Sequence, residues 1–446
     1  MVTHEPSVYD VVGIGFGPSN LSLAIALEDL GGFVGAGPVT AKFFERQSEF
    51  GWHKNMLLPS AKMQVSFLKD LVTFRNPYSR YSFVSYLHSV DRLTQFVNNC
   101  DFFPTRQEFH KYLEWVASYF TDKVSYGTEV TAITPLQGEY PGEPIDGWRV
   151  HVSSVDNPAD SYYVDARNLV LATGLVPKMP ENFVRDDHVW HSSEFLGKFQ
   201  RCDASKLSHI AVVGAGQSAA EIARHCYDYA PNATVSVIIP SYGYSIADST
   251  PFANQVFDPE AVDAYYYGEQ QAKNDIWKYH KNTNYGVVDD EVIRSLYQRK
   301  YDDEVRGVER LQFIELSRVT GVKRSGDDTR ITVYSLASDQ YRELDVDAIV
   351  CATGYESMNI GAMFGDIDGY FKRDSQDRYR LERDYRLITS ETVQAGVYLQ
   401  GGTEHSHGLS SSLLSNMATR SGEIAQSISE NRFYAVTREL MKVGRG

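Results

Sequence analysis

The chain has 446 residues, of which 42% are hydrophobic and 23% are charged, and its formal net charge is −15. This length allows two or three domains, and the composition is that of an ordinary globular protein. The acidic balance argues against nucleic acid or an anionic membrane as a main partner. The first residues lack the basic region and apolar core of a signal peptide, and no apolar run is long enough to span a membrane. We therefore expect a cytoplasmic protein.

The first predicted unit is a strand, a glycine-rich turn and a helix. Residues 8–13 are apolar and predict a buried strand, residues 19–30 predict the following helix, and residues 41–46 predict the next strand. The glycine-rich residues 31–38 predict a loop between that helix and that strand. A strand–turn–helix–strand unit with a right-handed crossover is typical of dinucleotide-binding folds.

A second unit of the same kind follows. Residues 167–172 predict a strand that ends in Ala-Thr-Gly, and residues 209–213 predict the strand that opens the second unit. The helix of this unit is predicted at residues 217–230, its second strand at residues 234–239, and a strand at residues 345–352 ends in another Ala-Thr-Gly. Two such units indicate two bound dinucleotides, which is the layout of a flavoprotein that is reduced by a nicotinamide.

The remaining segments indicate how the units are assembled. Residues 241–306 are polar and aromatic, with helical periodicity only in parts such as residues 291–299. Residues 397–401 predict a last strand, and residues 410–428 predict a last helix that begins with a serine run. The simplest assembly nests the second unit inside the first, so that the chain leaves the first sheet near Gly174 and returns near Asp347.

The first glycine turn stands in VVGIGFGPSN. Gly13 fits the tight turn, and Gly15 fits the position where the backbone approaches a pyrophosphate at a helix N-terminus. Gly17 stands one place early, and Pro18 replaces the last glycine of the fingerprint, although proline suits the first turn of a helix. Glu45 ends the next strand, where an acidic residue binds a ribose hydroxyl. The alternative is a tight turn with a solvated glutamate.

The second glycine turn stands in AVVGAGQSAAE. Gly214, Gly216 and Ala219 match the dinucleotide fingerprint with its permitted final alanine. An acidic residue at the end of the next strand favours NAD, and a nearby arginine favours NADP. Pro240 and Ser241 supply neither, so from the residues alone the preferred nicotinamide is open.

Polar residues outside the turns have ordinary alternatives. Lys69 lies in a segment of unusual composition, but a single lysine is usually a solvated charge. Asn254 and Asn284 precede helical stretches, where asparagine commonly caps a helix or makes a turn. The four cysteines form no CxxC pair, and nothing completes a metal site with His405 and His407. We therefore expect reduced thiols and no bound metal.

Several motifs stand in order along nearly the whole chain, and together they resemble one enzyme family. They are DVVGIGFGPSNLSLA, KMQVSFLKDLVTFRNP, VVGAGQSAAE, DSTPFANQVFDPE, NTNYGVVD, VCATGYE and HGLSSSLLS. The chain resembles the microbial N-hydroxylating flavin monooxygenases, which are the ornithine and lysine hydroxylases of siderophore biosynthesis. It is most similar to ornithine N5-hydroxylases of the actinobacterial type, because the lysine branch usually lacks the Asn-Thr-Asn-Tyr segment of residues 282–285.

The resemblance implies bound FAD, NADPH as reductant and O2 as co-substrate. It implies that the reduced flavin forms a hydroperoxide and that the neutral side-chain amine of L-ornithine attacks its distal oxygen. The product is N5-hydroxyornithine for a hydroxamate siderophore or a related natural product. The protein then supplies position, dryness and hydrogen bonds to the flavin chemistry. The resemblance also implies a homo-oligomer, a tetramer as in relatives.

The resemblance assigns roles to residues of this chain. The expected catalytic residues are Asn254, beside the reacting amine and the nicotinamide, and Gln64, which borders the isoalloxazine. The expected substrate-binding residues are Lys69, which meets the substrate carboxylate as a fixed cation, together with Asn254, Asn284 and Ser410. The expected cofactor-binding residues are Gly13, Gly15, Gly17, Pro18, Glu45, Trp52, His53, Met63, Gln64, Gly214, Gly216, Gln217, Ser218, Glu221 and Ser412.

The predicted class is α/β, with two nested Rossmann-like dinucleotide-binding domains and a smaller, mostly helical substrate-binding region. Residues 1–180 are predicted as the first part of the FAD-binding domain and residues 348–446 as its second part. Residues 181–347 are predicted as the NADPH-binding domain, which includes the substrate-binding region at about 241–306.

One departure from the family pattern and several alternative functions accompany this assignment. Many relatives place an arginine for the 2′-phosphate where this chain has Pro240, which weakens a strict preference for NADPH unless Arg224 or Ser241 substitutes. The alternatives are a lysine or diamine N-hydroxylase and, in a different class, a non-catalytic dinucleotide-binding sensor. A flavin disulfide reductase needs a redox cysteine pair beside the flavin, and a Baeyer–Villiger or sulfide-oxidising monooxygenase needs no cation for a substrate carboxylate.

Overall fold

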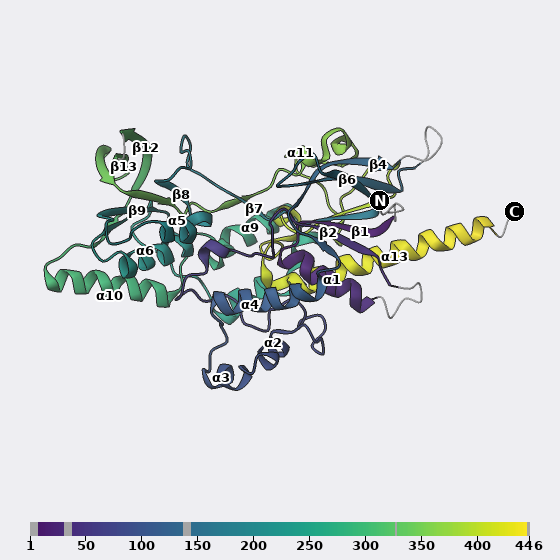
Figure 1. Cartoon of the computed structure of the whole chain (residues 1–446), viewed down its shortest axis with the longest axis horizontal. Coiled ribbons are helices and arrows are strands. Elements are labelled where there is room, and N and C mark those ends of the chain that lie inside the picture. The colour runs from purple at the N-terminus through teal and green to yellow at the C-terminus, as the bar shows by residue number, and fades with distance from the viewer. Residues whose placement is uncertain (1–7, 31–37, 137–143, 326–327, 444–446) are drawn as a thin grey trace.

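The computed structural model describes residues 8–30, 38–136, 144–325 and 328–443, and most of its strands belong to two separate larger sheets (Figure 1). The sheet with β1 and β6 lies toward one end of the molecule, and the sheet with β9 lies toward the other. The predicted loop at residues 31–38 falls mostly outside the described residues. None of the helices in these ranges is both long and apolar enough to cross a membrane.

The first sheet is built around the predicted first unit. Its strands run in the order β3-β2-β1-β6-β5-β4, and β17 also pairs with β6. Strands β1, β2 and β17 are parallel to their partners, whereas β4, β5 and β6 form an antiparallel ribbon. The strand bounds are Tyr9–Ile14 for β1, Ala41–Phe44 for β2, Val124–Ser125 for β3, Thr128–Leu136 for β4, Gly147–Ser154 for β5, Ser161–Leu171 for β6 and Gly396–Leu399 for β17.

Helices cover the first sheet and bury its apolar face. Helix α1 (Pro18–Leu30) is buried almost all round, because it packs between the sheet and α13 (Met417–Val443). Helix α4 (Arg106–Ala117) adds Phe109, Tyr112 and Leu113 to the same core, and Thr105 caps its N-terminus. The smaller elements of this part are η1 (Lys54–Met56), α2 (Phe83–Ser89), α3 (Leu93–Asn98) and η2 (Ser118–Phe120).

The second sheet is parallel and contains the second glycine turn. Its order is β11-β10-β9-β15-β8, and its strands are apolar and buried, as expected for a parallel sheet covered on both faces. Small residues on α6 (Gln217–Tyr229), including Ala219 and Ala223, allow that helix to pack closely on the sheet. The strand bounds are Val189–His191 for β8, His209–Val213 for β9, Thr234–Ile238 for β10, Leu311–Ile314 for β11 and Ala348–Cys351 for β15.

Further elements surround the second sheet and join it to the first. Strands β7 (Leu175–Pro177) and β16 (Tyr355–Ser357) pair antiparallel where the chain leaves and re-enters the first part. The remaining bounds are η3 (Ser192–Glu194), α5 (Phe195–Arg201), α10 (Asp290–Arg306), β12 (Ser317–Ser325), β13 (Asp328–Ser335), β14 (Gln340–Val346), α11 (Gly361–Phe364) and η6 (Gly365–Tyr370). Strands β12 to β14 form a third, antiparallel sheet.

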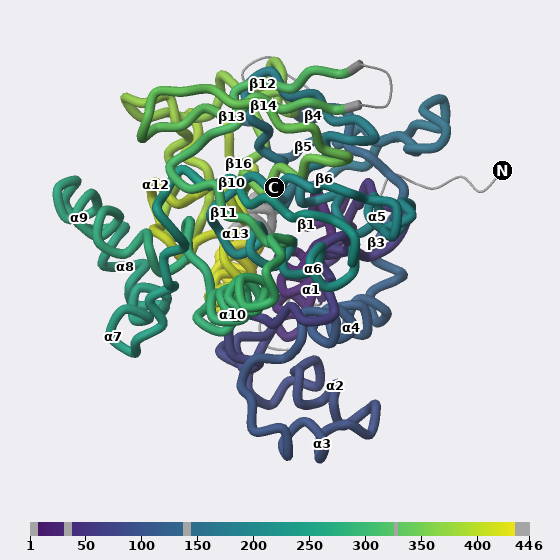
Figure 2. The backbone as a smooth tube through the Cα atoms, turned by 90° about the vertical axis from the view of Figure 1, so that its left-hand side faces the viewer, coloured from purple at the N-terminus to yellow at the C-terminus, as the bar shows by residue number. Residues whose placement is uncertain are grey.

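A group of short helices stands out beside the two sheets (Figure 2). It consists of α7 (Pro251–Asn254), η4 (Gln255–Phe257), α8 (Pro259–Tyr267), α9 (Gln270–His280) and η5 (Lys281–Thr283). Helix α12 (Glu404–His407) contacts α8, and η7 (Leu414–Asn416) leads into α13. These helices lie within the region predicted to bind substrate, and that role stays a prediction.

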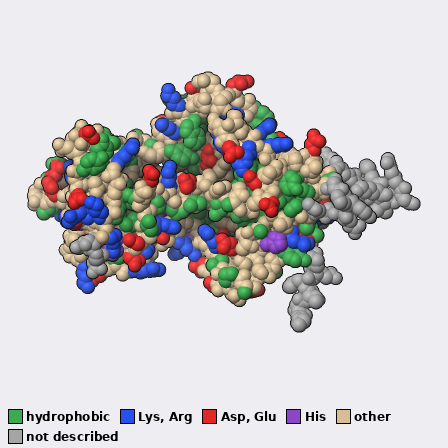
Figure 3. Space-filling view, turned by 90° about the horizontal axis from the view of Figure 1, so that it is seen from above, with side chains coloured by type: hydrophobic (Ala, Val, Ile, Leu, Met, Phe, Trp, Pro, Cys, Tyr) green, Lys and Arg blue, Asp and Glu red, His purple; other side chains and the backbone are tan. Residues whose placement is uncertain are grey.

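Acidic and basic side chains are interspersed on the outside of the molecule. Over much of the face drawn in Figure 3, red and blue side chains lie close together. The formal charge of −15 is therefore not gathered into one acidic surface on this face.

The predicted fold class is confirmed, with two local differences. The last helix was expected from residue 410, but α13 begins at Met417, because residues 408–413 form turns in which Leu413 N donates to Ser410 O at 3.1 Å. Serine hydroxyls compete for backbone hydrogen bonds, so a run of serines does not favour a helix. Strand β15 pairs with β8 and β9 in the second sheet, which moves the return to the first part from Asp347 to beyond Ser357.

Candidate functional site

The first glycine turn is shaped by close backbone contacts. Gly15 has a φ of +83°, and a Cβ atom there would lie 2.4 Å from the carbonyl oxygen of Ala172, at the end of β6. A Cβ on Gly13 would lie 2.2 Å from the ring of Phe43. Around Gly17 no atom lies within 4 Å, so packing does not demand a glycine there. Pro18 is the first residue of α1, so the N-terminus of this helix directly follows the glycine turn.

Glu45 braces this turn from the neighbouring strand. Its buried carboxylate accepts hydrogen bonds from the backbone N–H of Phe16 and of Gln47, each at 2.8 Å. These bonds place the carboxylate directly beside the glycine turn. Its predicted contact with a ribose hydroxyl stays a prediction.

The second glycine turn repeats the geometry of the first. Gly214 has a φ of +142°, and a Cβ there would lie 2.3 Å from the carbonyl oxygen of Ala352, which follows β15. Gly216 precedes α6, and Ser218 stands in the first turn of that helix. In both units the chain passes so close to an Ala-Thr-Gly segment that only glycine fits, which leaves the N-terminus of the helix open to an anion.

Glu221 joins the two parts of the molecule. Its carboxylate forms a two-pronged salt bridge with Arg106 of α4, with both N–O distances at 2.9 Å, and it also accepts a hydrogen bond from Gln217 at 3.0 Å. The side chain of Glu221 is 1% exposed. This carboxylate therefore faces the interface between the sheets, and its predicted cofactor contact stays a prediction.

The end of β10 has few groups that could bind the 2′-phosphate of NADPH. The hydroxyl of Ser241 donates to the carbonyl oxygen of Gly243 at 2.7 Å. Arg224 is 5% exposed and donates to the carbonyl oxygen of Ser60 at 3.0 Å, so its guanidinium is directed into the interface. Arg224 is thus a poor substitute for the arginine that Pro240 replaces.

The segment predicted to border the flavin lies between the two sheets. Trp52 packs edge-on against His53 and Phe109, and His53 in turn lies beside Tyr355 of β16. Met63 is 6% exposed, and its N–H donates to Pro104 O at 2.9 Å. The next residue, Gln64, has an exposed side chain that donates to Asp289 of the second part at 3.1 Å.

Lys69 is a cation held beside the helical group. Its ammonium lies 6.0 Å from the centre of the Phe257 ring, on η4. Partial burial lowers the pKa of Lys69, and the charge of Asp258 opposes this shift. Within the described part of the chain, no carboxylate lies within salt-bridge distance of this ammonium. Its charge is therefore available to a carboxylate from outside.

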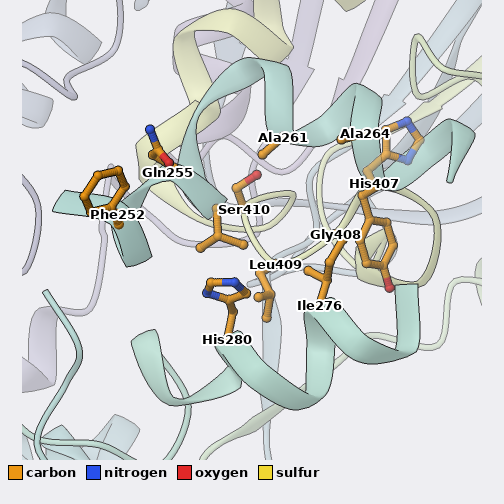
Figure 4. Close-up of a pocket in the computed structure, with 12 residues that line it drawn as sticks. Phe252, Gln255, Ala261, Ala264, Ile276, His280, His407, Gly408, Leu409 and Ser410 are labelled. Carbon is orange, nitrogen blue, oxygen red and sulfur yellow. The ribbon is translucent and has the colours of Figure 1, made fainter. Parts of the chain in front are cut away.

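A cavity of about 240 Å³ lies between α7, α8, α9 and the loop before η7 (Figure 4). Ser410, Leu409 and His280 lie around it, and Gln255 borders it next to Asn254. Of the predicted substrate-binding residues, Ser410 lines this cavity directly. Asn254 itself is not among the residues that line the cavity, and its amide donates to Ser249 O at 2.8 Å.

Asn284 precedes Tyr285, which interacts with the serine loop. Burial raises the pKa of Tyr285 to about 12, interactions of its hydroxyl with Ser412 and Asn284 oppose this shift, and the Ser412 hydroxyl donates to Glu404. The structure thus connects the Asn-Thr-Asn-Tyr segment to the serine run, two motifs that are far apart in the sequence. The roles of Asn254, Asn284, Ser410 and Ser412 stay predictions.

The two histidines of the serine motif have backbone partners. His405 Nε2 bonds to Tyr379 O at 2.8 Å, and His407 Nε2 bonds to Arg383 O at 3.0 Å. Burial lowers the pKa of His407 to about 3, so this ring is neutral at ordinary pH. Within the described ranges, no three His, Cys, Asp or Glu side chains are grouped to hold a metal ion.

Sequence patterns did not identify Arg106 and Asp289, which contact the predicted site residues Glu221, Gln64 and Gln217. Each partner is more than seventy residues away along the chain, so no local spacing links them. Arg106 and Asp289 could have been predicted only from knowledge of which surfaces of the two parts pack against each other.

Comparisons with known proteins show the family to which the chain belongs. Residues 7–357 match the family model of L-lysine 6-monooxygenase/L-ornithine 5-monooxygenase. The L-ornithine N(5)-monooxygenase of Emericella nidulans is 36% identical over 96% of this chain and 90% of its own length. Among solved structures, the Kutzneria sp. 744 ornithine N-hydroxylase, described as KtzI-FADred-NADP+-L-orn, is 56% identical, covers 96% of this chain and 100% of its own, and superposes with a TM-score of 0.91.

A third relative supports the same family. The ornithine hydroxylase PvdA of Pseudomonas aeruginosa is 35% identical, covers 95% of this chain and 100% of its own, and has a TM-score of 0.89. The predicted resemblance is therefore confirmed. The chain belongs to the L-lysine 6-monooxygenase/L-ornithine 5-monooxygenase family.

Proposed function

We propose that this protein hydroxylates the side-chain amine of L-ornithine at N5, with FAD and NADPH as cofactors and O2 as co-substrate. A relative named for ornithine hydroxylation is 56% identical to this chain, and this high identity supports ornithine over lysine or a diamine. The observation that carries the proposal is Lys69, a half-buried ammonium without a salt-bridge partner among the described residues. Its charge suits the carboxylate of an amino-acid substrate.

The two glycine turns fit the two cofactors. At Gly15 and Gly214 the backbone leaves no room for a side chain, and each turn opens at the N-terminus of a buried helix. Such a turn accepts a pyrophosphate through backbone N–H groups and the helix dipole. We assign FAD to the turn of Gly13 and Gly15, and NADPH to the turn of Gly214 and Gly216. When bound, the flavin supplies the redox and oxygen chemistry of the hydroxylation.

The chain's own residues then bind and orient the substrate. Lys69 holds the substrate carboxylate from the side of η4, and Asn284 binds the same amino-acid end. Ser410, which lines the cavity, and Asn254, which is next in sequence to the lining residue Gln255, direct the side-chain amine. The apolar lining from Leu409 and Ile276 keeps water from the reacting amine.

Three finer assignments belong to the same proposal. We place the enzyme in the cytoplasm, as a homo-oligomer, with a tetramer as the expected state. We place its product in the assembly of a hydroxamate siderophore or a related natural product. Size-exclusion chromatography with light scattering tests the oligomeric state.

A substrate panel tests the proposed function. Purified protein with FAD and NADPH is supplied with ornithine, lysine or putrescine, and the hydroxylamine product is measured. Ornithine should give the most product. Putrescine, which lacks the carboxylate, should give little, because it forgoes the contact with Lys69. Equal turnover of putrescine and ornithine would contradict the amino-acid assignment.

A further inference from the structure

Asp289 stands at the N-terminus of α10 but does not cap it. Aspartate at this position normally accepts a hydrogen bond from the first turn of its helix. Here no side-chain cap bond is formed. Instead, Oδ1 accepts from Gln64 Nε2 at 3.1 Å, and Oδ2 accepts from Gln217 Nε2 at 3.1 Å. The carboxylate is thus committed to two amides that come from different parts of the molecule.

These contacts fix the orientation of Gln217. Its Nε2 donates to Asp289 and also to Glu221 Oε1 at 3.0 Å, whereas its Oε1 accepts from the backbone N–H of Asp289 at 2.9 Å. An amide with acceptors on its nitrogen and a donor on its oxygen cannot turn over without losing these bonds. Glu221 is in turn held by Arg106 of α4. The first residue of α6 is therefore held from both sides of the interface.

The positions of Gln64 and Gln217 indicate which parts of the site Asp289 connects. Gln64 follows Met63 in the segment that lies between the sheets, and Gln217 is the residue after the second glycine turn. Under the proposed function, on which this inference rests, the first segment borders the flavin and the second borders the nicotinamide. Asp289 is the group that joins them. We call Gln64, Gln217 and Asp289 the Asp289 bridge.

We propose that Asp289 is a positioning residue that sets the relative placement of the flavin side and the nicotinamide side of the active site. Transfer between two bound groups depends steeply on their separation, and a misplacement of about 1 Å lowers a rate by about a hundredfold. The Asp289 bridge joins Gln64 to Gln217, the residue that follows the second glycine turn. A second contact nearby, between Lys62 and Glu291 at 3.1 Å, also spans the interface but touches neither glutamine.

The test compares Asp289→Asn with Glu291→Gln in the FAD-loaded protein. Asparagine keeps the size of aspartate but offers one acceptor where the carboxylate offers two, so one glutamine amide loses its partner. Glu291→Gln removes an inter-sheet contact of the same helix turn without changing the Asp289 bridge. For each variant, the rate of flavin reduction at saturating NADPH is measured anaerobically. The dissociation constant of NADP+ is measured by calorimetry, the melting temperature by differential scanning, and the half-saturation for ornithine from hydroxylated product in separate aerobic turnover.

The proposal predicts a selective defect. Asp289→Asn should slow flavin reduction about tenfold and weaken NADP+ binding severalfold, with an unchanged melting temperature and unchanged half-saturation for ornithine. Glu291→Gln should match the wild type in all four measurements, because an exposed ion pair contributes little. As a further check, Asp289→Asn combined with Gln217→Ala should slow reduction little more than Gln217→Ala alone.

Other results would overturn the proposal. If Asp289→Asn reduces flavin as fast as the wild type, the bridge does not position the cofactors. If the melting temperature falls, NADP+ binding weakens and the half-saturation for ornithine rises together, Asp289 only stabilises the fold. Because flavin reduction is measured without ornithine, a wild-type protein that is reduced by NADPH but inert toward ornithine would contradict the proposed substrate and still decide the role of Asp289.

Discussion

The substitution Lys69→Met isolates the charge that we assign to the substrate carboxylate. Methionine keeps an apolar stem that can pack on the Phe257 ring, which lies 6.0 Å from the ammonium in the native protein. The variant therefore removes the cation with little loss of packing. In the structure no salt bridge of the described residues depends on Lys69, so the fold should tolerate the change.

The size of the effect follows from the surroundings of Lys69. A hydrogen bond to a charged group contributes about 1.5–3 kcal/mol. Lys69 is half-buried and lies near the charge of Asp258, so screening by solvent and by that carboxylate favours the lower part of this range. A loss of about 1.5–2 kcal/mol corresponds to a rise of about ten- to thirtyfold in half-saturation for ornithine.

The assay separates binding of the amino acid from reduction of the flavin. NADPH oxidation, hydroxylated product and released peroxide are measured over a range of ornithine concentrations. We expect flavin reduction to stay near the wild-type rate while more of the NADPH consumed is released as peroxide. Lys62→Met, which removes an exposed lysine of the same segment, is the control and should behave as the wild type. Unchanged ornithine half-saturation and coupling in Lys69→Met would make Lys69 an ordinary surface charge and refute the carboxylate contact.

Three further predictions address the turns, the interface and the acid limit. Gly15→Ala should yield protein without flavin colour, because its Cβ would lie 2.4 Å from Ala172 O. The control Gly321→Ala, whose Cβ meets only ordinary contacts, should keep FAD. A yellow Gly15→Ala protein would contradict the assignment of FAD to the first glycine turn. Glu221→Gln should lower the free energy of unfolding by about 3 kcal/mol in denaturant titrations, because it leaves the Arg106 guanidinium without the carboxylate that it pairs with. A change near zero would show that the Arg106–Glu221 salt bridge contributes little to stability. His407 has a pKa of about 3 in the fold, below its ordinary value of 6.5, so the unfolded chain binds a proton at this residue more readily. The contribution of His407 to the free energy of unfolding should be complete above pH 6.5 and should decline from there toward pH 3. In unfolding experiments at a series of pH values, His407→Gln should flatten this decline.

The sequence was most informative where local chemistry determines structure. The glycine turns with their flanking apolar strands are self-contained, so β1, α1, β9, α6 and β10 were predicted to within a residue or two. The serine run misled at residue 410 because its hydroxyls and turns belong to a buried loop, and α13 starts only at Met417. Strand β15 was predicted as a strand, but its partner sheet depends on long-range pairing that a single strand does not reveal.

The candidate site divides in the same way. Resemblance supplied Lys69, Asn254, Asn284 and Ser410, and the structure places them around the serine loop and the helical group. The contacts that join the two sheets were not predictable, because Arg106–Glu221 and the Asp289 bridge link residues whose separation in sequence carries no pattern. Such contacts are decided by how two complete units dock, which is a property of the folded surfaces.

The origin of the oxygen atom tests the central claim most directly. FAD-loaded protein is supplied with NADPH, L-ornithine and isotopically labelled O2 in unlabelled water, and the product is examined by mass spectrometry. We expect N5-hydroxyornithine that carries one oxygen atom from the gas, with reduced or absent product when putrescine replaces ornithine. NADPH oxidation that yields only peroxide, or a product whose oxygen comes from water, would contradict it.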